Sequence, residues 1–385
     1  MDLKRLAIVT THPIQYYAPV FQRLHQRENI AINVYYTMGE GSAANYDAGF
    51  NKYIEWDLPL LKGYPFEWVK NTASKPSTSG FNGIINPGLI NQIEQWKPDA
   101  ILVYGWANKS HLKIIRYFKN TIPVFFRGDS TLLDEKPGIK ALLRRVFLKW
   151  VYKHISHAFY AGTNNKAYFK KYGLLDTQLS LAPHAIDNDR FKADRKTEAN
   201  LLREQLGIGS DEILILFAGK FENKKDPLLL LEAFLKIGSR NTHLLFVGNG
   251  ILEATLKIMA KGEYNIHFMD FQNQSYMPVI YQACDVFCLP SKGTAETWGL
   301  AVNEAMACSK TIVVSDKVGC AIDLVKPGSN GFIFRSGNLA DMMNKLKSLA
   351  DKNALVEMGK KSAQIIKDWS FENQLLAIEN KVIGG

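Results

Sequence analysis

The stretch SKGTAETWGLAVNEAMACS, residues 291–309, decides how the second half of the chain is interpreted. It follows the apolar run DVFCLP at 285–290, and good helix formers begin after Gly299. We therefore expect a strand, a loop and a helix that starts near Gly299. The amino end of a helix carries free N–H groups and a positive partial charge, so it would suit a phosphate or diphosphate.

Two glutamates flank the expected start of this helix. Glu296 lies in the loop, and Glu304 lies about a turn and a half inside the helix among Ala, Val, Met and Cys. Both carboxylates could accept hydrogen bonds from hydroxyl groups on either side of a diphosphate, which is the layout of a sugar nucleotide. The structural alternative is a helix-capping glutamate with a solvated partner. The apolar neighbours of Glu304 favour a function.

Short β-branched runs alternate with helical patterns in both halves of the chain. Five such runs begin at 6, 32, 100, 123 and 157, and five more begin at 212, 243, 264, 285 and 311. Strands that alternate with helices predict parallel sheets covered by helices on both faces. We expect an α/β fold with two doubly wound Rossmann-like domains that face each other across a cleft. Ligands of such sheets bind at the carboxyl ends of the strands.

The alternation is interrupted by a polar, charged segment at 184–212, where we place the domain boundary. The expected N-terminal domain covers 1–190 and the expected C-terminal domain covers 191–366. A final helix at 367–385 is expected to pack back on the first domain.

The 385 residues contain no apolar run long enough for a spanning helix, and the N-terminus does not resemble a signal peptide. The four cysteines lack metal-site or disulfide spacing, so we expect buried, reduced thiols and a cytoplasmic protein. The net charge of +10 has three candidate explanations, which are a nucleic acid, an anionic membrane surface and a phosphate-bearing substrate. We expect a phosphate-bearing substrate and no nucleic acid.

A basic, amphipathic helix is expected at 136–154. It carries six cations and an apolar set that recurs at helical spacing. One interpretation is a helix that lies on an anionic membrane surface, which would make the protein peripheral on the inner face of the cell membrane. The other is a core-packed helix with a solvated basic face, and the sequence leaves both open. The cations are Lys136, Lys140, Arg144, Arg145, Lys149 and Lys153.

Two common nucleotide-binding classes are not favoured. The first expected strand runs into TTHPIQYYAP, which lacks the glycine-rich turn of a dinucleotide-binding domain, and VGNGIL in the second half is a weak match. The phosphate-binding loop of nucleoside triphosphatases is also missing from the sequence.

The segment from Cys284 to Asn330 resembles the retaining GT-B glycosyltransferases of family four, whose signature is two glutamates separated by seven residues. The resemblance extends through FAGKFENKKDPLLLLEAF, LLFVGNG, FQNQSYMPVIYQACD and APHAIDNDRF, and covers about half of the chain. It implies transfer of a sugar from a nucleoside diphosphate sugar to a hydroxyl of a glycan or lipid-linked acceptor. It also implies a front-side attack without metal, in which the leaving diphosphate accepts the proton.

The resemblance implies roles for residues of the C-terminal domain. Glu304 would bind the ribose, and Glu296 would contact the donor sugar as a catalytic residue. Lys220 and Lys225 stand where the family has an arginine and a lysine, and they would neutralise the diphosphate. The first is a departure, because lysine supplies a point charge and not a bidentate fork. The other donor-binding positions are the base-binding Phe271 and the diphosphate-binding Thr297, Trp298, Gly299 and Leu300.

The N-terminal, acceptor-side domain offers three candidates at expected strand ends, which are His12, Arg127 and Asp129. Asp129 could position the acceptor hydroxyl, and Arg127 could contact the acceptor or the donor phosphate. Both are therefore candidate catalytic residues. Structural alternatives are a loop cap for Asp129 and a helix start for His12.

Two other functions remain open. A GT-B epimerase would use the same site to convert a sugar nucleotide without an acceptor. A non-catalytic protein would bind a sugar nucleotide or a membrane surface without turnover.

Overall fold

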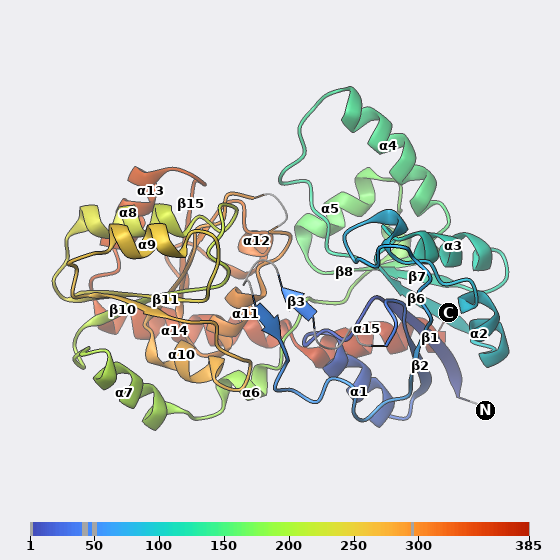
Figure 1. The fold of residues 1–385 in the computed structure, drawn as a ribbon, viewed down its shortest axis with the longest axis horizontal. Helices are drawn as coiled ribbons and strands as arrows, with labels where there is room; N and C mark the ends of the chain where they lie inside the picture. The colour runs from blue at the N-terminus through green and yellow to red at the C-terminus, as the bar shows by residue number, and fades with distance from the viewer. Residues whose placement is uncertain (1–2, 41–44, 48–51, 294–295, 385) are drawn as a thin grey trace. The chain divides into compact units, whose positions relative to one another are not determined.

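The computed structural model describes residues 3–40, 45–47, 52–293 and 296–384 (Figure 1). The chain divides into two compact units. Unit 1 comprises Met1–Asn45, Leu58–Pro183 and Phe371–Gly385, and unit 2 comprises Tyr46–Asp57 and His184–Ser370.

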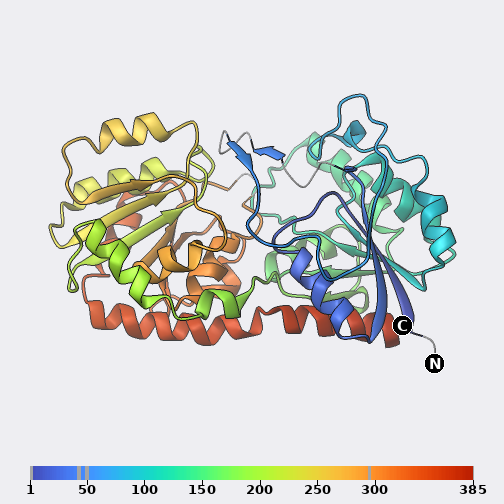
Figure 2. The same ribbon diagram turned by 60° about the horizontal axis from the view of Figure 1, so that its bottom comes forward.

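Unit 1 is built on a seven-stranded sheet in which each neighbouring pair of strands is parallel. The strands, in spatial order, are β5 (Phe66–Trp68), β2 (Ile30–Tyr36), β1 (Lys4–Thr10), β6 (Ala100–Tyr104), β7 (Val124–Arg127), β8 (His157–Tyr160) and β9 (Leu179–Leu181). Its helices are α1 (Ala18–Gln26), α2 (Leu89–Trp96), α3 (Lys109–Phe118), α4 (Ile139–Tyr152), α5 (Thr163–Lys171) and α15 (Phe371–Gly384). Figure 2 shows α15 beside α1, and both helices contact the sheet.

Unit 2 contains a six-stranded sheet, again with parallel neighbours. Its spatial order is β12 (Ile266–Met269), β11 (Thr242–Val247), β10 (Ile213–Ala218), β13 (Val286–Leu289), β14 (Thr311–Ser315) and β15 (Gly331–Phe334). The helices are α6 (Asn188–Lys192), α7 (Lys196–Gln205), α8 (Pro227–Ile237), α9 (Glu253–Met259), α10 (Met277–Ala283), α11 (Leu300–Ala307), α12 (Ala321–Leu324), α13 (Leu339–Lys347) and α14 (Lys352–Ile365). Two short strands, β3 (Asn45–Asp47) and β4 (Lys52–Ile54), pair with each other.

The central strands are apolar on both faces. In β1 the residues from Leu6 to Val9 are fully buried, and in β10 the residues from Ile213 to Ala218 are buried. Such continuous runs are stable only where helices cover both faces of a sheet. The expected α/β class with two doubly wound sheets is therefore confirmed.

In each sheet the polypeptide first forms a central strand, then adds strands on one side of it, and then continues with strands on the other side. In unit 2 the chain proceeds from β10 outward to β11 and β12, and then returns to β13 on the other side of β10. The carboxyl ends of β10 and β13 therefore flank the topological switch point, which is where open α/β sheets bind ligands. In unit 1 the corresponding strands are β1 and β6.

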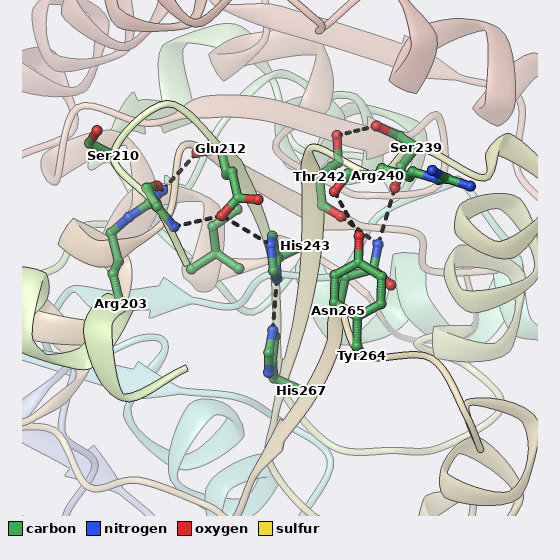
Figure 3. Close-up of polar contacts among 12 residues, drawn as sticks. Arg203, Ser210, Glu212, Ser239, Arg240, Thr242, His243, Tyr264, Asn265 and His267 are labelled. Atoms are coloured by element: carbon green, nitrogen blue, oxygen red, sulfur yellow. Dashed lines mark hydrogen bonds and ion pairs between the residues drawn. The ribbon is translucent and has the colours of Figure 1, made fainter. Parts of the chain in front are cut away.

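A row of polar side-chain contacts links the strands at the opposite, amino-terminal edge of the unit 2 sheet (Figure 3). Nε2 of His243 in β11 lies 3.4 Å from Oε2 of Glu212. Nδ1 of the same imidazole lies 3.0 Å from Nε2 of His267 in β12. The two imidazoles are stacked, with ring centroids 5.2 Å apart. The main-chain carbonyl of Glu212 accepts a hydrogen bond of 2.6 Å from Nη2 of Arg203. These contacts tie the amino ends of three neighbouring strands together.

All four cysteines are free and buried, as predicted. Within the described part of the chain, no cluster of three or more His, Cys, Asp or Glu side chains could hold a metal ion. None of the helices formed by the described residues is long and apolar enough to cross a membrane.

Candidate functional site

The candidate site in unit 2 is formed by two loops that leave the carboxyl ends of neighbouring strands. Residues 219–226 follow β10, and the described residues 290–293 and 296–299 follow β13. The first loop carries Lys220 and Lys225, while the second carries Glu296 and leads into α11. The predicted donor-binding residues of both loops are therefore brought to the switch point of one sheet.

Lys225 and Glu296 form an ion pair that joins the two loops. Nζ of Lys225 contacts Oε2 of Glu296, and Oγ of Ser291 donates a hydrogen bond of 2.9 Å to the same oxygen. A second pair lies beside it, where Nζ of Lys292 is 2.8 Å from Oδ1 of the buried Asp226. The site thus presents fixed charges of both signs, which are suited to a ligand with phosphates and hydroxyl groups.

The segment from Glu296 to Trp298 is held by main-chain bonds to the loop after β14. The N–H of Gly319 donates to the carbonyl of Glu296 at 3.1 Å, and that of Cys320 donates to the carbonyl of Trp298 at 2.9 Å. A Cβ on Gly319 would lie 1.8 Å from the carbonyl oxygen of Thr297, so only glycine permits this approach. The catalytic candidate Glu296 is therefore fixed by main-chain contacts as well as by its own side chain.

Helix α11 begins at Leu300, as the sequence predicted. Gly299 is its N-cap, with φ at 96°, and no side chain caps the helix. A Cβ on Gly299 would lie 2.9 Å from Cγ1 of Val318. The first amides of a helix have no partner within the helix, and they carry positive partial charge. They lie directly after Glu296 in the chain and form a candidate diphosphate site.

Glu304 is buried on α11. Its Oε2 accepts a hydrogen bond of 2.9 Å from the hydroxyl of Tyr281 in α10. Since Glu304 is buried, the alternative of a solvated glutamate is wrong for this residue. Next to Glu304, Asn303 accepts from Nε1 of Trp298 at 2.8 Å and donates to the carbonyl of His184 at 2.8 Å.

The predicted base-binding residue, Phe271, lies after β12 at the same edge of the sheet. Its N–H donates to Oδ1 of Asn249 at 2.9 Å, and its ring lies 6.2 Å from that of Trp56. Asn249 also donates to Oδ1 of Asp270 at 2.9 Å. This residue, from the loop after β11, therefore fixes the main chain at Phe271.

In unit 1, His12 follows β1, whereas Arg127 and Asp129 lie at the end of β7, which is separated from β1 by β6. Nδ1 of His12 is 2.9 Å from the hydroxyl of Thr11, and burial lowers the pKa of His12. The pKa of Tyr17 is raised, first by burial and then by the nearby Asp129 carboxylate. All three candidates lie at the carboxyl edge of the unit 1 sheet.

Arg127 has a structural contact that the sequence did not indicate. Its buried guanidinium donates to the carbonyls of Ala182 at 2.8 Å and Pro183 at 3.3 Å, where the chain leaves unit 1. This anchors the connecting segment. A role of Arg127 toward an acceptor stays a prediction.

Ser291, Tyr281 and Gly319 contact the predicted site residues but were missed. Ser291 is the first polar residue after an expected strand, which is a usable sequence indication. Tyr281 and Gly319 approach the site from other elements, α10 and the loop after β14. Their roles depend on tertiary packing that no local pattern records.

Comparison with known proteins gives a match over residues 198–367 to the family model described as Glycosyl transferases group 1. A D-inositol 3-phosphate glycosyltransferase of Geodermatophilus obscurus is 28% identical over 202 residues, which is 49% of this chain and 44% of the relative. A lipopolysaccharide 1,2-N-acetylglucosaminetransferase of Salmonella typhimurium is 26% identical over 219 residues, or 53% of this chain and 56% of the relative. The chain thus spans about half the length of the curated relatives it matches.

Similarity in three dimensions covers the whole chain. The Anabaena protein HepE in complex with UDP superposes with a TM-score of 0.74 at 16% identity, over 100% of both chains. The chain has the GT-B fold.

Proposed function

We propose that the protein is a retaining glycosyltransferase, which moves a sugar from a nucleoside diphosphate sugar to a hydroxyl of a glycan or lipid-linked acceptor. The observation that carries the proposal is the pair of the partly buried Lys225 and the buried Glu296 at the switch point of the unit 2 sheet, just before the amino end of α11. The match over residues 198–367 and the names of the relatives support it.

Each part of the donor has a chemically suitable partner. Lys225 and Lys220 would neutralise the diphosphate together with the first amides of α11. The Glu296 carboxylate would accept hydrogen bonds from hydroxyls of the donor sugar, and the buried Glu304 would accept them from the ribose. The edge-to-face pair of Phe271 and Trp56 would border the base.

In the proposed reaction the acceptor oxygen forms a bond to the anomeric carbon while the bond from that carbon to the diphosphate oxygen breaks. The acceptor proton passes to an oxygen of the leaving diphosphate on the same face of the sugar, so the anomeric configuration is retained. Fixed cations stabilise the charge that develops on the leaving group. We therefore propose that neither a metal ion nor a cofactor is required.

The acceptor is proposed to bind in unit 1, where Asp129 would position its hydroxyl and His12 and Arg127 would line the site. The Salmonella relative is named for lipopolysaccharide, and HepE was solved with UDP. We therefore propose assembly of a bacterial surface glycan or glycoconjugate, in the cytoplasm and at the inner face of the membrane.

A thermal-shift panel in EDTA tests the donor class, with UDP, GDP, dTDP, ADP, CMP and NAD as ligands. A ligand at about one hundred times its Kd stabilises the native state by about 2.7 kcal/mol, which is a shift of a few degrees. We expect one nucleoside diphosphate to raise the midpoint. A shift with NAD alone would overturn the proposal.

Turnover of the matching sugar nucleotide then separates the remaining functions. The transferase proposal is supported if product forms only when a glycan acceptor is added and if the product retains the anomeric configuration of the donor. Conversion of the donor without an acceptor would identify an epimerase, and binding without turnover would identify a binding protein.

A further inference from the structure

Helix α4 of unit 1 exposes a row of large apolar side chains. Ile139, Leu142, Leu143, Val146 and Phe147 are between 41% and 80% exposed. In the described part of the chain, no other helix or strand exposes more than two large apolar side chains. Figure 1 shows α4 at the periphery of unit 1.

Packing against unit 1 accounts for only one member of this row, Phe147, whose ring lies 5.5 Å from that of Trp106. Successive residues of a helix are about 100° apart, so the five exposed side chains occupy an arc of about 140° around α4. The side chains that α4 buries lie on the opposite side of the helix and are Leu148, Val151 and Tyr152. The helix therefore has two apolar faces, and unit 1 covers only one of them.

Cations border the exposed apolar face on both sides. At the same angular spacing, Lys140 lies beside one border and Lys149 beside the other, and Arg144 and Arg145 lie about 60° beyond these borders. All four are exposed, and α4 contains no acidic residue. Glu135, just before α4, is engaged by Lys171 at 2.6 Å and by the hydroxyl of Tyr172 at 2.8 Å, and it also interacts electrostatically with Arg144.

We propose that the exposed face of α4 binds an anionic lipid surface, with its apolar side chains inserted among the acyl chains and its cations at the headgroups. An apolar strip flanked by Lys and Arg is the pattern of a helix that lies in the membrane interface. A second copy of the chain fits less well. In a symmetric contact through this strip, each row of cations would face a row of cations. The proposal does not depend on the transferase activity.

Vesicle flotation of the full-length protein tests the proposal. One set of vesicles contains phosphatidylcholine alone, and in the other part of the phosphatidylcholine is replaced by phosphatidylglycerol. We expect flotation with the anionic vesicles, weakened by added salt, and little with the neutral ones. Absence of flotation with the anionic vesicles would overturn the proposal.

Matched variants identify the surface. Leu142→Ser with Leu143→Ser should abolish flotation, and Arg144→Gln with Arg145→Gln should reduce the bound fraction at least several-fold. The controls change equally exposed side chains of unit 2: Ile251→Ser with Ile258→Ser, and Lys361→Gln with Lys367→Gln. They should float like the unchanged protein. Equal losses in test and control variants would contradict the assignment to α4.

A fluorophore reports on the face itself. The emission maximum of an environment-sensitive label on Leu143→Cys should shift to the blue when anionic vesicles are added. The emission maximum of the same label on Ile258→Cys should not shift. The four native cysteines are buried and should not compete for the label. If Leu142→Ser with Leu143→Ser instead converts a dimer into a monomer and leaves flotation unchanged, α4 joins two copies of the chain and the lipid proposal is wrong.

Discussion

Lys225 and Glu296 are 71 residues apart in the chain, yet their side chains form an ion pair that joins the loops after β10 and β13. Both side chains are largely buried, and Ser291 provides a further donor to the carboxylate. When a diphosphate binds, Lys225 has to serve two anionic partners. In the proposed function, the pair would therefore couple the position of the Glu296 carboxylate to the presence of phosphate.

The coupling predicts a non-additive effect on stability. Lys225→Met leaves the buried carboxylate of Glu296 without its cation and should cost about 2–3 kcal/mol, since removal of one partner of a buried pair is strongly destabilising. Glu296→Gln keeps the shape and should cost less. The double variant should regain part of the loss of Lys225→Met. Urea unfolding of the four proteins measures this, with Lys224→Met as the exposed control.

The same variants separate binding from turnover. Lys225→Met should weaken the binding of a nucleoside diphosphate, because the phosphate loses a fixed cation. Glu296→Gln should reduce transfer far more than it reduces nucleotide binding. Equal losses of binding and transfer in Glu296→Gln would contradict its proposed role at the donor sugar.

Tyr281→Phe tests the positioning of Glu304. The change removes only the hydroxyl that donates to Oε2 of the carboxylate, and should cost about 1 kcal/mol of stability. The Glu304 carboxylate would be held less firmly. We therefore expect a several-fold higher KM for the proposed donor at nearly unchanged kcat. Tyr264→Phe is the control, because that hydroxyl donates to the carbonyl of Arg240 on the exposed surface. A loss confined to kcat would argue against a positioning role of Tyr281.

Gly319→Ala tests whether the loop after β14 holds the 296–298 segment. The added methyl would collide with the carbonyl of Thr297, so we expect a loss of about 3 kcal/mol or more and weaker nucleotide binding. Gly337→Ala is a control, since nothing lies within 4 Å of a Cβ there and only the strain of a φ of 72° remains. That control should lose about 1 kcal/mol and keep its affinity. Similar behaviour of the two variants would show that the contact is not needed.

The long central strands could be predicted because they are buried on both faces and therefore read as unbroken apolar runs. All ten expected strands are present. In the two large sheets, the strands that were not predicted are β5, β9 and β15, which have three or four residues and lie at sheet edges, where burial imposes little pattern. In β15, a Cβ at position 331 would lie 1.8 Å from the carbonyl oxygen of Ile312, so this position is a glycine. The glycine interrupts the apolar pattern of the strand.

Residues 46–57 show the limit of local patterns most clearly. They interrupt unit 1 in the sequence but belong to unit 2, where Oδ2 of Asp57 accepts a hydrogen bond of 3.0 Å from the N–H of Ser275. Nothing in their composition indicates that contact. The charged residues of the site were easier to predict, because Lys225 and Glu296 follow recognisable strands. Tyr281, which contacts Glu304 from α10, could only be found from side-chain geometry.

Two histidines, the buried His157 and the partly buried His267, predict how stability depends on pH. Burial lowers the pKa of His267 to about 4, with a further contribution from the neighbouring His243, and burial also lowers the pKa of His157 to about 4. An unfolded histidine titrates near 6.5, so the unfolded chain binds more protons than the folded one between about pH 6.5 and pH 4. Stability should therefore fall as the pH is lowered through this window.

His267→Gln should make that fall shallower, because it removes one of the groups whose protonation favours unfolding while it keeps a side-chain donor toward His243. A single such group contributes at most about 1.4 kcal/mol per pH unit. Urea unfolding between pH 7 and pH 4.5 would measure the difference, with the exposed His25→Gln as control. If both variants keep the slope of the unchanged protein, the unfolding that limits stability does not open the amino-terminal edge of the unit 2 sheet.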